Sequence, residues 1–260
     1  MEEETITKRL TRKEKRLLRR QGKNPENIQE KLNFNLKHFE PLTENQKLTY
    51  KSYETGKHLF LCGSAGSGKT FLSLYLALKE VLEGNNKSSR TKIVIVRSAQ
   101  SSKDIGYLPG SHKQKLEVYE SAYKNICTEL FGRGDAYEYF KQKGIIEFHP
   151  TSFLRGMTLE NSIIIVDEFQ DMCWNEITLI SSRVGKNSRI IYSGDLRQTD
   201  LKFDRDRKGH IVFANIIKTL PSIETIEFTE RDIVRSGFCK EWIIACSKYE
   251  QNNGVSLLNM

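Results

Sequence analysis

Short apolar runs alternate with amphipathic stretches along most of this 260-residue chain. The apolar runs are rich in Ile and Val and are bounded by turn-forming residues, which is typical of buried strands. They lie at residues 58–62, 92–96, 145–149, 162–166, 189–192 and 224–228. Helical patterns lie at residues 44–55, 69–83, 111–131, 174–184 and 210–219. Strands that alternate with helices form parallel β-α-β units, so the pattern predicts a three-layer α/β fold with a mainly parallel sheet.

The beginning of the chain has a different pattern. Residues 8–23 contain nine Lys or Arg and a single Glu, and their leucines recur at helical intervals. This predicts a short basic amphipathic helix. We therefore divide the chain into a basic N-terminal arm with a connector, residues 1–40, and an α/β domain, residues 41–260.

The net charge of +8 owes much to this arm. A basic helix attracts nucleic-acid backbones without sequence preference. Two other interpretations stay open: the arm is solvated and flexible, or its leucines dock on a neighbouring subunit. Its apolar face is thin for a membrane surface.

Composition narrows the class of protein. No apolar run reaches the roughly 18 residues of a membrane span, and the N-terminus has no apolar signal region. The five cysteines are odd in number, widely spaced and without zinc-site spacing. We expect a cytoplasmic protein with no membrane partner, with Mg²⁺ as the only metal.

Residues 63–70 read GSAGSGKT, between the first predicted strand and the first long helix. Such a glycine-rich turn at a helix N-terminus directs backbone N–H groups at a polyphosphate. Lys69 is placed to reach the β- and γ-phosphates, and Thr70 to offer its hydroxyl to Mg²⁺. The alternative is a Gly/Ser surface loop. The predicted nucleotide-binding residues here are Gly63, Ser64, Ala65, Gly66, Ser67, Gly68, Lys69, Thr70 and Phe71.

A second chemical signal follows the apolar run IIIV at residues 163–166. Asp167 emerges at the carboxyl end of this strand, where open parallel sheets bind ligands. It is suited to hold Mg²⁺, and Glu168 to accept the proton of an attacking water.

Two further polar residues complete the predicted site. Gln198, in the turn GDLRQ that begins after residue 193, is placed to sense the γ-phosphate. Gln46 has an amide whose donor and acceptor match the Hoogsteen edge of adenine. Both assignments compete with ordinary local roles for such residues.

Several blocks together resemble the PhoH-like family of P-loop ATPases, which is itself similar to the motor core of superfamily-one helicases. The blocks are GSAGSGKT, GYLPGSHKQK at 106–115, SFLRGMTLENSIIIVDEFQD at 152–171, SRIIYSGDLRQTDL at 188–201 and ERDIVRSGF at 230–238. The short length and the basic arm are more like the stand-alone versions found in bacteriophages, for which the compartment is the host cytoplasm.

The resemblance implies a RecA-like sheet of the additional-strand, catalytic-glutamate type, ATP hydrolysis with Mg²⁺, and action on RNA or DNA. It implies the roles given above for Lys69, Thr70, Asp167, Glu168 and Gln198, and an adenine-reading role for Gln46. Arg97 is followed by Ser-Ala where many relatives have Pro-Ala, which changes the turn but keeps the arginine.

One RecA-like domain lacks the second domain from which such helicases take an arginine for the γ-phosphate. We therefore expect a neighbouring protomer to supply it, most simply in a hexameric ring. The candidates are Arg155, Arg231 and Arg235.

Three function classes follow from these residues. The first is an ATPase coupled to single-stranded RNA or DNA, acting as a helicase or translocase and gripping the strand with the arm and with Arg97, Lys103, Tyr107, Lys113 and Lys115. The second is a nucleotide-gated binding protein with little turnover. The third is a small-molecule kinase, against which the Asp-Glu pair speaks because it favours water as the nucleophile.

Overall fold

The computed structural model describes residues 34–83, 90–98, 112–196 and 204–253. Six strands form one sheet: β1 (His58–Gly63), β2 (Lys92–Arg97), β3 (Ile146–Pro150), β4 (Ser162–Asp167), β5 (Arg189–Gly194) and β6 (Ile223–Phe228). The helices are α2 (Glu44–Glu54), α3 (Lys69–Glu83), α4 (His112–Phe131), α5 (Ala136–Gln142), α6 (Trp174–Ser181), α7 (Asp204–Ile217) and α8 (Gly237–Asn253).

The strand order is β3-β2-β4-β5-β1-β6, and every pairing is parallel. Strand β5 therefore lies between β1, which leads into the glycine-rich loop, and β4, which ends in the acidic pair. This inserted strand is the additional strand that the resemblance implied. The predicted three-layer α/β fold is confirmed.

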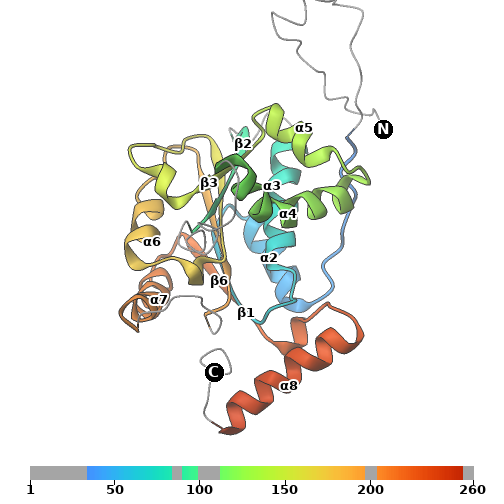
Figure 1. The fold of residues 1–260 in the computed structure, drawn as a ribbon, viewed down its shortest axis with the longest axis vertical. Coiled ribbons are helices and arrows are strands. Elements are labelled where there is room, and N and C mark those ends of the chain that lie inside the picture. The colour runs from blue at the N-terminus through green and yellow to red at the C-terminus, as the bar shows by residue number, and fades with distance from the viewer. Residues whose placement is uncertain (1–33, 84–89, 99–111, 197–203, 254–260) are drawn as a thin grey trace, which may run out of the picture.

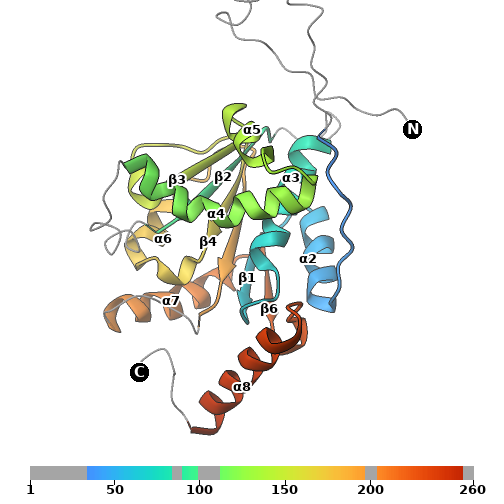
Figure 2. The same ribbon diagram turned by 45° about the vertical axis from the view of Figure 1, so that its right-hand side comes forward.

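Alternate residues of each central strand face opposite layers. Leu59, Ile93, Ile163 and Ile191 pack with side chains of α3, α4 and α5. Their neighbours in sequence pack with residues of α6 and α7 on the other face. Figures 1 and 2 show these two groups of helices on opposite sides of the sheet. Because both faces are covered, the strands are continuous apolar runs.

The segment before α2 belongs to the packed structure from its first described residue. Phe34 is buried against Phe131, Tyr139 and Phe140, with ring centroids 4.4–5.9 Å apart. Residues 1–33 lie outside the described residues, so the division between arm and domain at residue 41 and the helix predicted within residues 8–23 stay predictions.

The helices differ from the predicted pattern at several places. Helix α7 begins at Asp204, six residues before the predicted 210. The prediction missed this start because the polar stretch DRDRK shows no apolar periodicity. Helix α6 ends at Ser181 rather than at 184. Helices α5 and α8 were not predicted. Within the described residues, no helix combines the length and the apolar character that crossing a membrane requires.

Candidate nucleotide site

The glycine-rich loop joins β1 to α3 and has the conformation that its sequence predicts. Gly63, Gly66 and Gly68 have φ angles of 117°, 75° and 82°, a region that L-residues rarely adopt. A Cβ on Gly63 would lie 1.9 Å from the carbonyl oxygen of Phe228 on the neighbouring β6. Glycine is therefore required at this position by both conformation and space.

Lys69 is folded back over this loop. Its Nζ donates to the carbonyl oxygens of Gly63 and Ser64, at 2.8 and 2.9 Å. The side chain is 8% exposed, and burial lowers the pKa of its ammonium group. Ser64 and Ser67 are buried beneath the loop, where the Ser67 hydroxyl donates to the Ser64 carbonyl at 2.8 Å. The Ser67 hydroxyl thus braces the loop from within, and neither serine lines the cavity that borders the loop.

Asp167 and Thr70 meet at the adjacent strand end. The Thr70 hydroxyl donates to Oδ1 of Asp167 at 2.9 Å, and the Tyr123 hydroxyl donates to Oδ2 at 2.7 Å. Asp167 is 3% exposed. A hydroxyl and a carboxylate oxygen side by side are the hard oxygen ligands that Mg²⁺ prefers, so these residues fit the predicted metal.

Glu168 follows at the first residue beyond β4 and has left-handed backbone angles, φ 50° and ψ 48°. Its Oε2 accepts a hydrogen bond from the side-chain amide of Gln170 at 2.7 Å. Burial and the neighbouring Asp167 carboxylate raise the pKa of Glu168 above its ordinary value of 4.5. The side chain is thus held in place, and its pKa is raised in the direction that favours a general base.

Gln170 also joins this corner to the next strand. Its Oε1 accepts from the backbone N–H of Asp195 at 3.0 Å. A Cβ on Gly194 would lie 2.1 Å from the same oxygen, so Gly194 allows this close approach. Gln198, the predicted γ-phosphate sensor, lies outside the described residues, three positions beyond Asp195.

Gln46 lies on α2 behind the loop and is 5% exposed. Its amide donates to the Ser67 carbonyl at 3.1 Å, and its Oε1 accepts from the backbone N–H of Leu42 at 2.7 Å. The side chain therefore ties the loop to the segment before α2. Its predicted contact with adenine would use the amide hydrogen and lone pair that these two bonds leave over.

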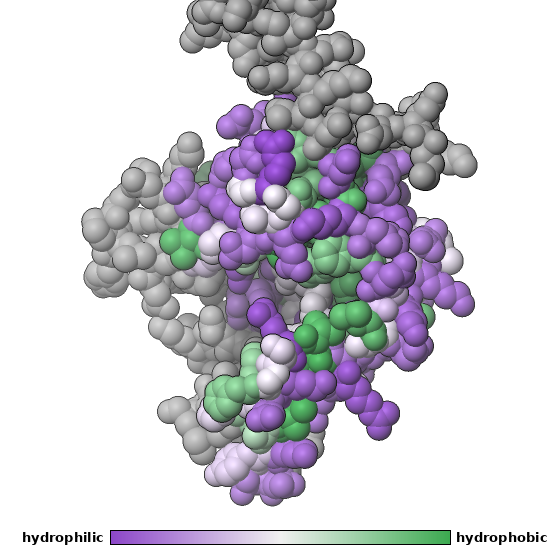
Figure 3. All heavy atoms as spheres, turned by 90° about the vertical axis from the view of Figure 1, so that its right-hand side faces the viewer, coloured by the Kyte–Doolittle hydropathy of each residue, from purple (hydrophilic) through white to green (hydrophobic). Residues whose placement is uncertain are grey.

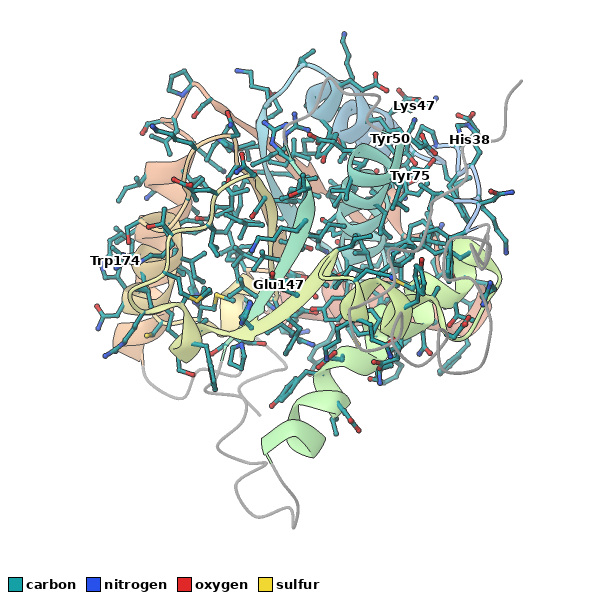
Figure 4. The ribbon with its side chains drawn as sticks, turned by 90° about the horizontal axis from the view of Figure 1, so that it is seen from above. His38, Lys47, Tyr50, Tyr75, Glu147 and Trp174 are labelled. Carbon is teal, nitrogen blue, oxygen red and sulfur yellow. The ribbon has the colours of Figure 1, made fainter. Side chains whose placement is uncertain are left out.

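Lys69, Thr70, Asp167, Glu168 and Gln46 border one cavity of about 810 Å³. Its walls include Ala65, Gly66, Gly68, Lys69, Thr70, Phe71, Asp167, Glu168 and Asp195. Phe39, Leu42 and Tyr50 extend it away from the carboxylates. Figure 4 shows Tyr50 beside Tyr75 between α2 and α3, with ring centroids 5.9 Å apart. The cavity thus has a polar half for phosphates and an aromatic half.

Arg97 lines the same cavity, at the end of β2. Burial acts to lower the pKa of its guanidinium, but Tyr123, Asp167 and Glu168 outweigh burial and raise it. We had expected Arg97 to grip a nucleic-acid strand. The structure places it beside the acidic pair, and its contact with a nucleic-acid strand stays a prediction.

The three arginines predicted as candidates for the γ-phosphate contact lie in different surroundings. Arg235 lines the cavity of its own chain, and its Cγ would lie 3.0 Å from a Cβ on Gly66. Arg155, after the short helix η3 (Thr151–Leu154), and Arg231 are exposed, and neither is part of the cavity wall. Of the three, the structure thus brings Arg235 to the candidate cavity of its own chain.

Two residues that the sequence analysis did not single out now have clear places in the site. Gln170 holds Glu168, and Tyr123 holds Asp167. Gln170 stands within the DEFQD block, so its proximity to the acidic pair could have drawn attention to it. Tyr123 comes from a different helix, and no sequence signal marks it.

Comparison with known proteins gives a consistent family. The family described as PhoH-like protein matches residues 38–247. The chain is 31% identical over 191 residues to the PhoH-like protein of Bacillus subtilis, covering 73% of this chain and 58% of that protein. It is 28% identical over 205 residues to the protein PhoH of Escherichia coli, covering 76% and 55%. The chain spans less than two thirds of the length of these relatives.

Solved structures resemble the fold in part. Pif1 from a Bacteroides species, in complex with ADP-AlF4, superposes on 84% of this chain and 48% of its own, with a TM-score of 0.40 and 16% identity. A large terminase from a thermophilic bacteriophage covers 82% of this chain and 50% of its own, with a TM-score of 0.45 and 8% identity.

Proposed function

This chain belongs to the PhoH-like protein family, and from that premise we propose that it hydrolyses ATP with Mg²⁺ while acting on single-stranded RNA or DNA. The observation that carries the proposal is the single cavity in which Lys69, Thr70, Asp167 and Glu168 meet. A phosphate-binding loop alone supports the binding of a nucleotide but not its hydrolysis. The addition of a restrained carboxylate beside the metal ligands supports hydrolysis.

Each residue has a separate task. The loop amides and Lys69 bind the phosphates, and Thr70 with Asp167 holds Mg²⁺, which supplies charge neutralisation to the phosphate oxygens. Glu168 takes a proton from a water molecule, and Gln170 keeps its carboxylate oriented. Gln198, three positions beyond Asp195 in the sequence, is proposed to sense the γ-phosphate.

The proposed hydrolysis also needs an arginine that stabilises the charge of the transition state. Arg235 stands beside Gly66 of its own loop, so it serves the nucleotide of its own protomer. Arg155 and Arg231 point into solvent and are free to serve a neighbour's site. An arginine so placed raises the rate of comparable phosphoryl transfers ~10³–10⁵-fold.

We propose a hexameric ring, because in a ring each protomer can receive an arginine from its neighbour. The exposed face of α8 supports it, because Phe238, Trp242, Ala245 and Tyr249 lie on one stripe with spacings of four, three and four residues. Phe238 and Trp242 are 77% and 60% exposed. Figure 3 shows apolar side chains at this end of the molecule, where α8 lies. Helix α8 begins two residues after Arg235, so a second copy docked on this stripe lies close to the cavity.

The nucleic-acid partner is proposed from the charge of the N-terminal arm and from the family. The nine basic residues between positions 8 and 23 neutralise the phosphates of the nucleic-acid backbone. The bound single strand of RNA or DNA then stimulates ATP hydrolysis. Movement along the strand, as in a helicase or translocase, is the proposed use of the hydrolysis energy.

The test measures phosphate release from ATP with and without single-stranded RNA and DNA, at low and at high salt. Stimulation that weakens with salt supports the proposal. ATP bound without release of phosphate would indicate the nucleotide-gated alternative, and phosphate transferred to an added acceptor would indicate a kinase.

A further inference from the structure

The Asp167 carboxylate is held from two sides by hydroxyl groups. Thr70 donates to Oδ1 at 2.9 Å, and Tyr123 donates to Oδ2 at 2.7 Å. Thr70 is itself placed to bind Mg²⁺, so its hydroxyl has a second use when nucleotide is present. Tyr123 has no such competing task and holds the carboxylate in both states.

Tyr123 is as deeply buried as Asp167, the residue to which it donates its hydrogen bond. It is 1% exposed and lies on α4, a helix that carries none of the phosphate-binding or acidic motifs. Its ring packs near Phe148 of β3, with centroids 6.0 Å apart, and Asp167 itself is 3% exposed. A buried phenol of this kind has little freedom to swing away, so it restricts the carboxylate to one orientation.

The orientation of a carboxylate ligand affects the binding of Mg²⁺ strongly. Mg²⁺ demands near-ideal octahedral geometry, so a ligand turned by a small angle binds it poorly. Hydrogen-bond partners of metal ligands typically change metal affinity by roughly 10–100-fold. From these contacts we propose that Tyr123 is a positioning residue that orients Asp167 and thereby makes nucleotide binding depend on Mg²⁺. This inference rests on the proposed ATP site.

The test measures ADP affinity by calorimetry in Mg²⁺ and in EDTA, and the ratio of the two dissociation constants is the coupling. In Tyr123→Phe the ring stays and the hydroxyl is lost. We expect the coupling to fall roughly tenfold or more, while the affinity in EDTA stays that of the parent. The unchanged EDTA value also shows that the variant is folded.

The chain offers a matched control in Tyr137. It is likewise 1% exposed, and its hydroxyl donates to a buried carboxylate, Oε2 of Glu120, at 2.8 Å. Tyr137→Phe loses the same kind of hydrogen bond outside the cavity wall and is expected to keep the parent coupling. A general loss of stability would affect both variants alike.

A double variant separates positioning from any other role. If Tyr123 acts through Asp167, then adding Tyr123→Phe to Asp167→Asn lowers the coupling no further than Asp167→Asn alone. A parent-like coupling in Tyr123→Phe, or a further loss in the double variant, overturns the inference and leaves the ATP site intact. Failure of the parent protein to bind ADP in either condition overturns the proposed function and this inference with it.

Discussion

Glu168 has a backbone conformation that non-glycine residues seldom adopt, with φ 50° directly after a buried strand. Such a residue costs of order 1–3 kcal/mol and persists where surrounding structure enforces it. Here the enforcing contacts are the Gln170 amide on the side chain and the buried strand before it. The strained backbone thus lies at the residue that lines the cavity as the proposed general base.

Replacement of Glu168 by Gln keeps the shape of the side chain and removes its basicity. We expect ATP hydrolysis to fall ~10²–10⁴-fold, as for the loss of a general base, with ADP affinity close to that of the parent. Steady-state phosphate release and calorimetry check the two parts. Glu160→Gln, an exposed position shortly before the same strand, serves as the control. Undiminished turnover in Glu168→Gln would remove the proposed base.

Residues on the loop and at the end of β4 could be predicted from the sequence because each is fixed by neighbours in the chain. Glycine at positions 63, 66 and 68, Lys69 and the acidic pair all follow from local turn and strand patterns. Tyr123 could not be predicted, since its partner Asp167 is 44 residues away and the contact depends on how α4 packs over the sheet.

At the scale of elements, the turn after β6 brings Arg235 to the loop. The short helix η5 (Glu230–Asp232) ends one residue before Ile233, and the backbone N–H of Val234 then donates to the Gly66 carbonyl at 3.1 Å. Asp232 holds this turn, because its Oδ2 accepts from the Thr229 N–H and from the Asn45 amide, both at 2.8 Å. Helix α2, the turn and the loop are thereby joined.

The variant Asp232→Asn tests this connection through the pH dependence of the unfolding free energy. Burial alone would raise the pKa of Asp232, but hydrogen bonds from Thr229, Thr43 and Asn45 outweigh it and lower the pKa below its ordinary 3.8. The ionised form is therefore the stabilising one, at full strength well above pH 3.8 and lost as the pH falls toward the lowered pKa. We expect the variant to lose about 1 kcal/mol of unfolding free energy at pH 7 and less near pH 3.

Urea unfolding of both proteins between pH 3 and pH 7 measures this difference. A difference that is constant with pH, or that grows as the pH falls, would contradict the role given to the ionised carboxylate.

The elements themselves were predictable to different degrees. The central strands were found within one or two residues, because burial on both faces requires continuous apolar runs. Helix α8 was missed, since its apolar side chains lie largely on an exposed stripe and not in the core. The start of α7 is polar and shows no apolar periodicity, so the sequence pattern did not reveal it.

At the scale of the whole molecule, α8 projects from the body of the fold (Figures 1 and 2). It begins two residues after Arg235, which lines the cavity. Its stripe leaves Phe238 and Trp242 stacked on each other in solvent, with centroids 6.2 Å apart. Exposed aromatic pairs of this size are typical of protein interfaces. The proposed ring uses this surface.

Trp242→Glu places a charge in the middle of the stripe. We expect it to convert the ring to the 30.1 kDa monomer and to lower ATPase activity if a neighbour's arginine completes the site. Light scattering measures the mass, and Tyr249→Glu near the end of the same stripe should have a smaller effect. A parent protein that is already a fully active monomer would refute the ring.

The measurement that tests the central claim most directly compares Lys69→Ala with the parent for ATP binding and phosphate release in Mg²⁺. Because Lys69 lies over the loop at the phosphate half of the cavity, its loss is expected to lower the hydrolysis rate roughly 10²-fold or more and to weaken ATP binding. Lys51→Ala, an exposed lysine on α2, should match the parent. If Lys69→Ala binds and hydrolyses ATP as well as the parent, the loop after β1 is not the nucleotide site.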